Sequence, residues 1–117
     1  MKKETEPDPT CFPATEPELA LDLRPVEGAA ADEELALLAK ALGHPARVRI
    51  LRLLSRKEAR VCSQIVGELP LAQSTVSEHL RILKEAGLIR SREEGSRVGY
   101  CIHSPALRRF KALVGIL

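Results

Sequence analysis

Apolar side chains recur at helical spacing in the stretch 70–88, near the middle of the chain. The spaced positions are Val76, Leu80 and Leu83. This spacing predicts a helix with one buried face, preceded by Pro70 and ended by Gly87. A shorter apolar helix is predicted just before it, at residues 63–69. Two helices separated by a tight break are typical of a helix-turn-helix.

The other side of this second helix is polar, and it is the candidate DNA-reading surface. Its members are Gln73, Ser74, Thr75, Ser77 and Arg81. Short hydroxyl and amide side chains can both donate and accept hydrogen bonds, which suits the edges of bases in the major groove. An ordinary surface helix that meets only water would show the same pattern. The helix alone therefore does not decide between the two interpretations.

An alternating pattern follows the helix and predicts a β-hairpin. Extended segments are expected at 88–92 and 97–103, with a glycine-containing turn at 93–96 between them. A hairpin directly after the second helix of a helix-turn-helix is a wing. Arg92 and Arg97 would lie on this wing, where they could reach flanking phosphates or the minor groove. The hairpin therefore favours DNA binding.

The remaining pattern completes a winged helix-turn-helix, a mainly α fold with a small β-hairpin wing. Asp32 is a plausible N-cap for a helix over 32–42, and Pro45 opens a second helix that ends at residue 54 or 55. A very short strand is predicted at 59–62, and Pro105 opens the last helix. We expect residues 32–117 to form the DNA-binding and dimerisation domain.

The first and last helices carry apolar stripes that so small a core would not cover in a monomer. Pairing these helices in a symmetric homodimer would bury the stripes. It would also place two recognition helices about one DNA turn apart, as a palindromic operator requires.

Charge divides the chain into two parts. Residues 1–34 hold three Lys and Arg against ten acids, whereas residues 35–117 hold fifteen against six. A basic body fits a double-stranded DNA partner. Residues 1–31 contain five prolines and predict a flexible acidic tail that carries Cys11. The chain has no membrane-length apolar run and no export signal, so we expect a cytoplasmic protein.

The body also resembles the ArsR/SmtB family of metal- and metalloid-responsive repressors. The resemblance rests on L-A-K-A-L-G-H-P-A-R-V-R-I-L-R-L-L (38–54), Q-S-T-V-S-E-H-L-R-I-L-K-E-A-G-L-I (73–89) and R-V-G-Y-C-I (97–102). It implies a homodimer that binds a palindromic operator, represses transcription and dissociates from the DNA when an inducer binds. Ala72 stands where many members have Ser, which puts the cap of the recognition helix in question.

The resemblance also raises the question of the inducer. Well-known arsenic sensors carry two cysteines near the third helix, whereas E-A-R-V-C-S-Q-I (58–65) has Cys62 alone. The last helix lacks the Asp, His and Glu through which other members bind zinc.

Three cysteines are candidate ligands for the inducer: Cys11, Cys62 and Cys101. In a winged helix the short strand pairs with the second wing strand, so Cys62 and Cys101 could lie across from each other. Cys11 sits on a tail long enough to reach them in either subunit. Three converging thiolates suit a soft three-coordinate ion, for which As(III) is the natural match and Sb(III) another. An organoarsenical would need only two of them.

Other interpretations of the same cysteines remain open. Cys62 and Cys101 could be small buried hydrophobic residues, with Cys11 incidental. Together with Cys11 and His103, these two cysteines could hold zinc tetrahedrally. Cys62 and Cys101 alone could form a disulfide or polysulfide link in a redox sensor. The sequence shows no C-x-x-C and no Cys–His motif, so we do not expect an enzyme.

Overall fold

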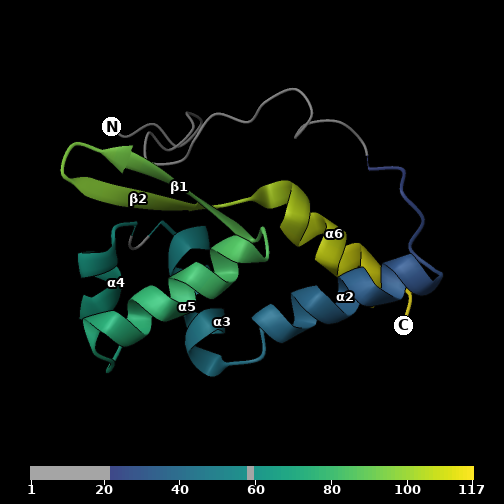
Figure 1. Cartoon of the computed structure of the whole chain (residues 1–117), viewed down its shortest axis with the longest axis horizontal. Helices are drawn as coiled ribbons and strands as arrows, with labels where there is room; N and C mark the ends of the chain where they lie inside the picture. The colour runs from purple at the N-terminus through teal and green to yellow at the C-terminus, as the bar shows by residue number, and fades with distance from the viewer. Residues whose placement is uncertain (1–21, 58–59) are drawn as a thin grey trace.

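The computed structural model describes residues 22–57 and 60–117, which form a helical body with one β-hairpin (Figure 1). The elements are α2 (Ala29–Ala41), α3 (Pro45–Ser55), α4 (Cys62–Gly67), α5 (Gln73–Glu85), β1 (Ile89–Glu94), β2 (Arg97–Ile102) and α6 (Ser104–Gly115). The predicted order of helix-turn-helix, hairpin and final helix is confirmed. The fold is that of a winged helix-turn-helix.

The helix-turn-helix and the wing form one end of the molecule, and α2 with α6 forms the other (Figure 1). In the first group α5 packs against α3, α4 and β1. In the second, α2 and α6 lie side by side. The two ends share a core, whose largest fully buried side chains are Ile50, Leu53, Ile65, Val76, Leu80, Leu83, Leu88, Ile89 and Leu113.

The first helix begins earlier than predicted. Asp32 is not its N-cap: α2 starts at Ala29 after Gly28, whose φ of 111° a side chain would strain, and the Asp32 amide donates to the Gly28 carbonyl at 2.9 Å. The extension is stable because alanine favours helix and Ala31 is buried in the core. The folded part therefore starts before residue 32, and the tail predicted for 1–31 lies mostly outside the described residues.

The wing is longer and its turn tighter than the sequence indicated. Glu94 pairs with Arg97, so the strands continue to a two-residue turn in which Gly95 has a φ of 67°. Of the strand predicted at 59–62, the described residues 60–62 form one antiparallel bridge between Val61 and Gly99, beside a hydrogen bond from the Tyr100 amide to the Arg60 carbonyl at 2.8 Å.

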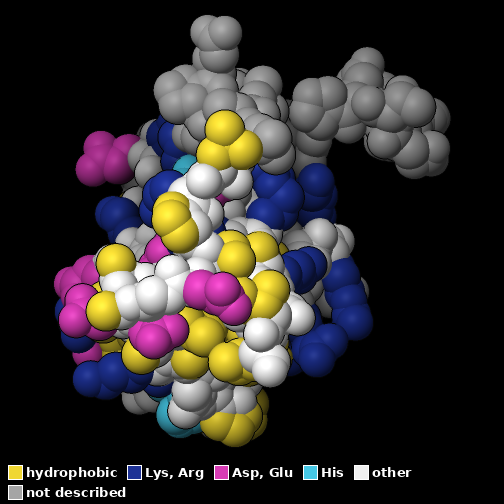
Figure 2. All heavy atoms as spheres, turned by 90° about the vertical axis from the view of Figure 1, so that its right-hand side faces the viewer, with side chains coloured by type: hydrophobic (Ala, Val, Ile, Leu, Met, Phe, Trp, Pro, Cys, Tyr) yellow, Lys and Arg dark blue, Asp and Glu magenta, His cyan; other side chains and the backbone are white. Residues whose placement is uncertain are grey.

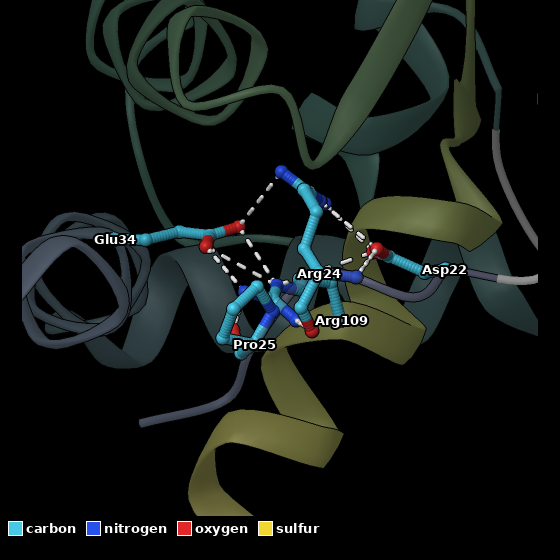
Figure 3. A network of polar contacts seen from close by, with 5 residues as sticks. All are labelled: Asp22, Arg24, Pro25, Glu34 and Arg109. Carbon is cyan, nitrogen blue, oxygen red and sulfur yellow. Dashed lines mark hydrogen bonds and ion pairs between the residues drawn. The ribbon is translucent and has the colours of Figure 1, made fainter. Parts of the chain in front are cut away.

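A buried arginine fastens α6 to α2 and to the segment before α2 (Figure 3). Arg109 is only 5% exposed, and its guanidinium donates to both carboxylate oxygens of Glu34 at 3.0–3.1 Å. It also donates to the carbonyls of Arg24 at 3.1 Å and Pro25 at 2.6 Å. Every contact of this guanidinium thus crosses from α6 to the N-terminal part of the described chain. None of the described helices is both long and apolar enough to cross a membrane.

Glu34→Ala should lower the free energy of unfolding by about 2 kcal/mol, because it removes the carboxylate that accepts hydrogen bonds from the buried Arg109 and leaves only Asp22, 4.0 Å away. Chemical denaturation followed by circular dichroism measures this change. Glu33→Ala removes the same charge from the exposed neighbouring position and should change stability by less than about 0.5 kcal/mol. Equal losses in the two variants would contradict a structural role for the pair.

Candidate nucleic-acid interface

Helix α5 separates a buried face from an exposed one. Its buried side chains are Val76, His79, Leu80 and Leu83. All five residues predicted to read DNA on this helix are exposed: Gln73, Ser74, Thr75, Ser77 and Arg81. The helical period places the two sets on different sides, and packing of the first set against the core holds the second outward. The exposed face is therefore available to a partner.

The start of α5 lacks a side-chain cap, as expected from the alanine at position 72. Ala72 has extended backbone angles (φ −68°, ψ 155°) and makes no capping hydrogen bond. The first amides of the helix are therefore left without a side-chain acceptor at the positive end of the helix dipole. Oxygen atoms of a phosphate are suitable acceptors for such amides.

Arg81 is already engaged on its own helix. Its guanidinium forms ion pairs with Glu78, three residues before it, and with Glu85 at 2.7 Å. Hydrogen bonds that Arg81 donates to Glu78 and Glu85 raise the pKa of Arg81, and the bond from Arg81 lowers the pKa of Glu78. Exposed pairs of this spacing contribute little to stability because solvent screens them, so Arg81 can exchange a carboxylate for a phosphate at small cost.

The wing presents its predicted arginines to solvent and is attached to the body by an ion pair. Arg92 and Arg97 are both exposed. Glu94, at the end of β1, pairs with Arg60 from the segment before α4. Gly99 makes room for this pair, because a Cβ at that position would lie 3.0 Å from the Arg60 Nη2 and from the Glu94 Oε2. The Arg60–Glu94 pair therefore helps to set the angle between the wing and the helix-turn-helix.

The structure does not place Cys62 opposite Cys101, and that expectation was wrong. With Val61 paired to Gly99, the antiparallel register puts Cys62 level with Val98, three positions away from Cys101. Three positions along a strand are about 10 Å, whereas each sulfur must lie ~2.3 Å from a shared ion. The cause is that Cys62 opens α4 rather than ending a strand.

Each of these thiols has a different environment. Cys101 is buried, and Cys62 is half-buried, with its Sγ 3.6 Å from the Ser77 Oγ on α5. Burial, together with the Cys62 thiol, raises the pKa of Tyr100. Tyr100 and Cys101 are neighbours on β2 and so point to opposite faces. Both thiols are free, and the part of the chain that the structure describes holds no cluster of three or more His, Cys, Asp or Glu that could bind a metal. Cys11 lies outside that part.

A pair of histidines with an arginine lies behind the recognition helix, and the sequence analysis missed it. His79 is 7% exposed, and its Nδ1 lies 3.1 Å from the Arg47 Nη1. The ring of His44 lies 4.5 Å from the ring of His79, centroid to centroid. The sequence does indicate that His79 is buried, because position 79 falls three residues after Val76 and four before Leu83 on the apolar face of the helix.

The end of the molecule formed by α2 and α6 exposes apolar side chains. Figure 2 looks onto this end and shows hydrophobic side chains gathered among acidic ones. The exposed large members are Leu37 on α2 and Val114, Ile116 and Leu117 at the end of α6, together with Leu23. Leu37 also borders an open cavity of about 460 Å³ between the two helices. We call this the α2–α6 face.

Comparison with known proteins identifies the fold's family. The sequence model of the bacterial regulatory protein arsR family matches residues 44–91, which run from the start of α3 into β1. An uncharacterized HTH-type transcriptional regulator of Methanocaldococcus jannaschii, MJ1325, is 38% identical over 70% of this chain and 92% of its own. The chain belongs to the arsR family.

Other relatives and solved structures cover a similar share of the chain. The transcriptional repressor PagR of Bacillus anthracis is 38% identical over 62% of this chain and 73% of its own. The homodimeric winged helix-turn-helix DNA-binding domain Mb0332 of Mycobacterium bovis superposes with a TM-score of 0.59 at 31% identity, over 74% of this chain and 80% of that one. The structure of a possible transcriptional regulator for arsenical resistance superposes with a TM-score of 0.59 at 28% identity, over 71% of this chain and 81% of that one. PagR is a transcriptional repressor, and the two structures are those of possible transcriptional regulators, so the expectation of a transcriptional regulator rather than an enzyme is confirmed.

Ala72→Ser should raise the free energy of unfolding of this arsR-family protein by about 1 kcal/mol. Its hydroxyl would accept a hydrogen bond from an amide in the first turn of α5, which no side chain now provides. Thermal unfolding by calorimetry measures the gain. Ala72→Val also suits an extended backbone but has no acceptor, so the cap explanation fails if valine stabilises the protein equally.

Proposed function

We propose that this chain is a homodimeric transcriptional repressor that binds a palindromic DNA operator through α5 and the wing. The observation that carries the proposal is the exposed polar face of α5, held outward by its buried face beside a basic hairpin. Side chains at the start of α5 would read base edges in the major groove. Arg92 and Arg97 on the wing would contact phosphates and fix the register.

The α2–α6 face supports the homodimer. Leu37 on α2 is 68% exposed, and Leu117, just past the end of the adjoining α6, is 91% exposed; a symmetric partner would cover both. The related Mb0332 domain is homodimeric. Because this face lies at the opposite end of the molecule from α4, pairing through it leaves both copies of α5 uncovered (Figure 1). Two recognition helices about one DNA turn apart would then match a palindrome.

The inducer in this proposal is trivalent arsenic, with antimony as a related ion, bound to cysteine thiolates. Cys62 is the central ligand, because an ion on its sulfur would disturb the 3.6 Å contact with Ser77 on the recognition helix. The likeness to a possible regulator for arsenical resistance supports this choice of ion. Cys101 and Cys11 are the further ligands, and Cys101 joins only if the bridge between Val61 and β2 shifts.

A thiol redox or persulfide sensor is the second candidate. It is favoured by the separation of Cys62 from Cys101, because oxidation of a single half-buried thiol needs no second sulfur nearby. Zinc sensing through the same residues is a third outcome that the same experiment separates.

If α5 and the wing bind DNA, one substitution on α5 and one on the wing should weaken binding in different ways. A duplex bound by the protein is first selected from random sequences. Gln73→Ala should then weaken binding by about 1–3 kcal/mol and relax preference at one base pair, because it removes a base contact. Arg97→Ala should weaken binding to all duplexes and lower the salt slope by about 1.

Fluorescence anisotropy at several salt concentrations measures both effects. Lys111→Ala is the matched control, because it removes one positive charge from the exposed surface of α6, away from α5 and the wing. If this control weakens binding as much as Arg97→Ala, only overall charge matters. Failure to select any preferred duplex would refute the repressor proposal.

The inducer claim is tested on the same complex by adding arsenite, zinc or a mild oxidant. Arsenite should release the DNA from the wild-type protein and not from Cys62→Ser, with an affinity change of several-fold to about a hundred-fold. Release by zinc alone contradicts the arsenic claim, and release by the oxidant alone establishes the redox alternative. A full arsenite response in Cys62→Ser would show that this thiol is not the site.

A further inference from the structure

Arg47 connects three parts of the molecule through one guanidinium. It belongs to α3, and its Nε donates to the Ala41 carbonyl at the end of α2 at 2.6 Å. Its Nη1 lies 3.1 Å from the Nδ1 of His79 on α5. The same side chain therefore joins the helix of the α2–α6 face to the recognition helix. His79 points away from the DNA-reading face, so the proposed base contacts do not use it.

The Arg47–His79 contact requires one protonation state of the histidine. A guanidinium has only N–H donors, so the Nδ1 of His79 must accept, which places the ring proton of a neutral imidazole on Nε2. When the ring gains a second proton, both nitrogens become donors and the ring becomes cationic. The protonated ring then has no acceptor to offer Arg47 and repels its charge.

We propose that Arg47 and His79 form a proton-sensitive latch that holds α5 in its DNA-reading position relative to α2. With His79 neutral the latch is closed and α5 is fixed for operator binding. Protonation of His79 opens the latch and loosens α5, so acid weakens binding. Both residues are positioning residues, and the latch rests on the proposed DNA-binding function of α5.

The surroundings of His79 set the direction of this effect. Burial, then His44 and Arg47 from α3, lower the pKa of His79, and only Glu78 on its own helix opposes them. Of the other elements packed against α5, α4 carries Cys62 as its one titratable residue, and β1 carries Arg90, Arg92, Glu93 and Glu94. Because the folded-state pKa lies below the ordinary 6.5, the stability that neutral His79 contributes is complete above about pH 6.5. It is lost as the pH falls below that value.

The expected acid response is opposite to the general trend for DNA-binding proteins. Lowering the pH makes a protein more positive, which by itself strengthens its attraction to phosphates. A fall in affinity below about pH 6.5 would therefore need a specific cause. Two substitutions separate the latch from that background. His79→Asn keeps a hydrogen-bond acceptor near the position of Nδ1 but does not titrate. His79→Leu removes both the acceptor and the titrating group.

The experiment measures affinity for the selected duplex from about pH 8 to about pH 5.5, with circular dichroism confirming that each variant stays folded. Wild-type affinity should fall about ten-fold across this range, the size expected for losing one charge-assisted hydrogen bond. His79→Asn should bind as wild type at about pH 8 and keep that affinity in acid. His79→Leu should bind about ten-fold more weakly at every pH.

A second readout does not depend on DNA. In the wild-type protein, NMR titration should give His79 a pKa below 6.5, and the Arg47 Nη signals should move with the same pKa. The latch is refuted if His79 titrates at 6.5 or above, if the Arg47 signals do not follow it, or if His79→Asn loses affinity in acid as the wild type does. Absence of binding to any duplex at about pH 8 would instead refute the proposed function, while the NMR titration still decides the latch.

Discussion

Burial of one face of α5 determines where its other face points. Val76, Leu80 and Leu83 are each at most 1% exposed, in contact with a core built from α3, α4 and β1. Fully burying side chains of this kind stabilises a protein by about 1.5–3 kcal/mol each, which is more than any exposed ion pair on the helix contributes. A rotation of α5 would expose these residues, so the polar face has one orientation. The wing has a fixed place beside it, because the chain enters β1 within four residues of the helix end.

The same constraint explains why the sequence predicts this part of the fold well. Helical spacing at 76, 80 and 83 is a local pattern that specifies α5 and its buried side. The alternation at 98, 100 and 102 specifies the strand β2 but not its buried side, because the buried residues there are Gly99 and Cys101. The prolines at 45 and 105 fall in the first turns of α3 and α6, where they were expected. The start of α2 was missed, because Gly28 and three alanines extend the helix where Asp32 offers the more conventional cap.

Relations between distant segments were not predictable in the same way. Whether Cys62 faces Cys101 depends on which residue of β2 pairs with Val61, and a shift of a few positions changes every partner. Hydrophobic pattern does not fix that register in a single bridge. The Arg47–His79 and Arg109–Glu34 contacts likewise join residues 32 and 75 positions apart. Arg47 belongs to a run of α3 arginines that helical spacing would place at the surface, yet its guanidinium turns inward to the Ala41 carbonyl and to His79.

The central claim is that the exposed face of α5 and the wing meet DNA while the α2–α6 face does not. Amide chemical-shift mapping during titration with the selected duplex tests this claim directly. If α5 and the wing meet the DNA, the largest shifts fall on residues 72–81 and on the wing around Arg92 and Arg97. Large shifts on α2 and α6, with α5 and the wing unchanged, would contradict it.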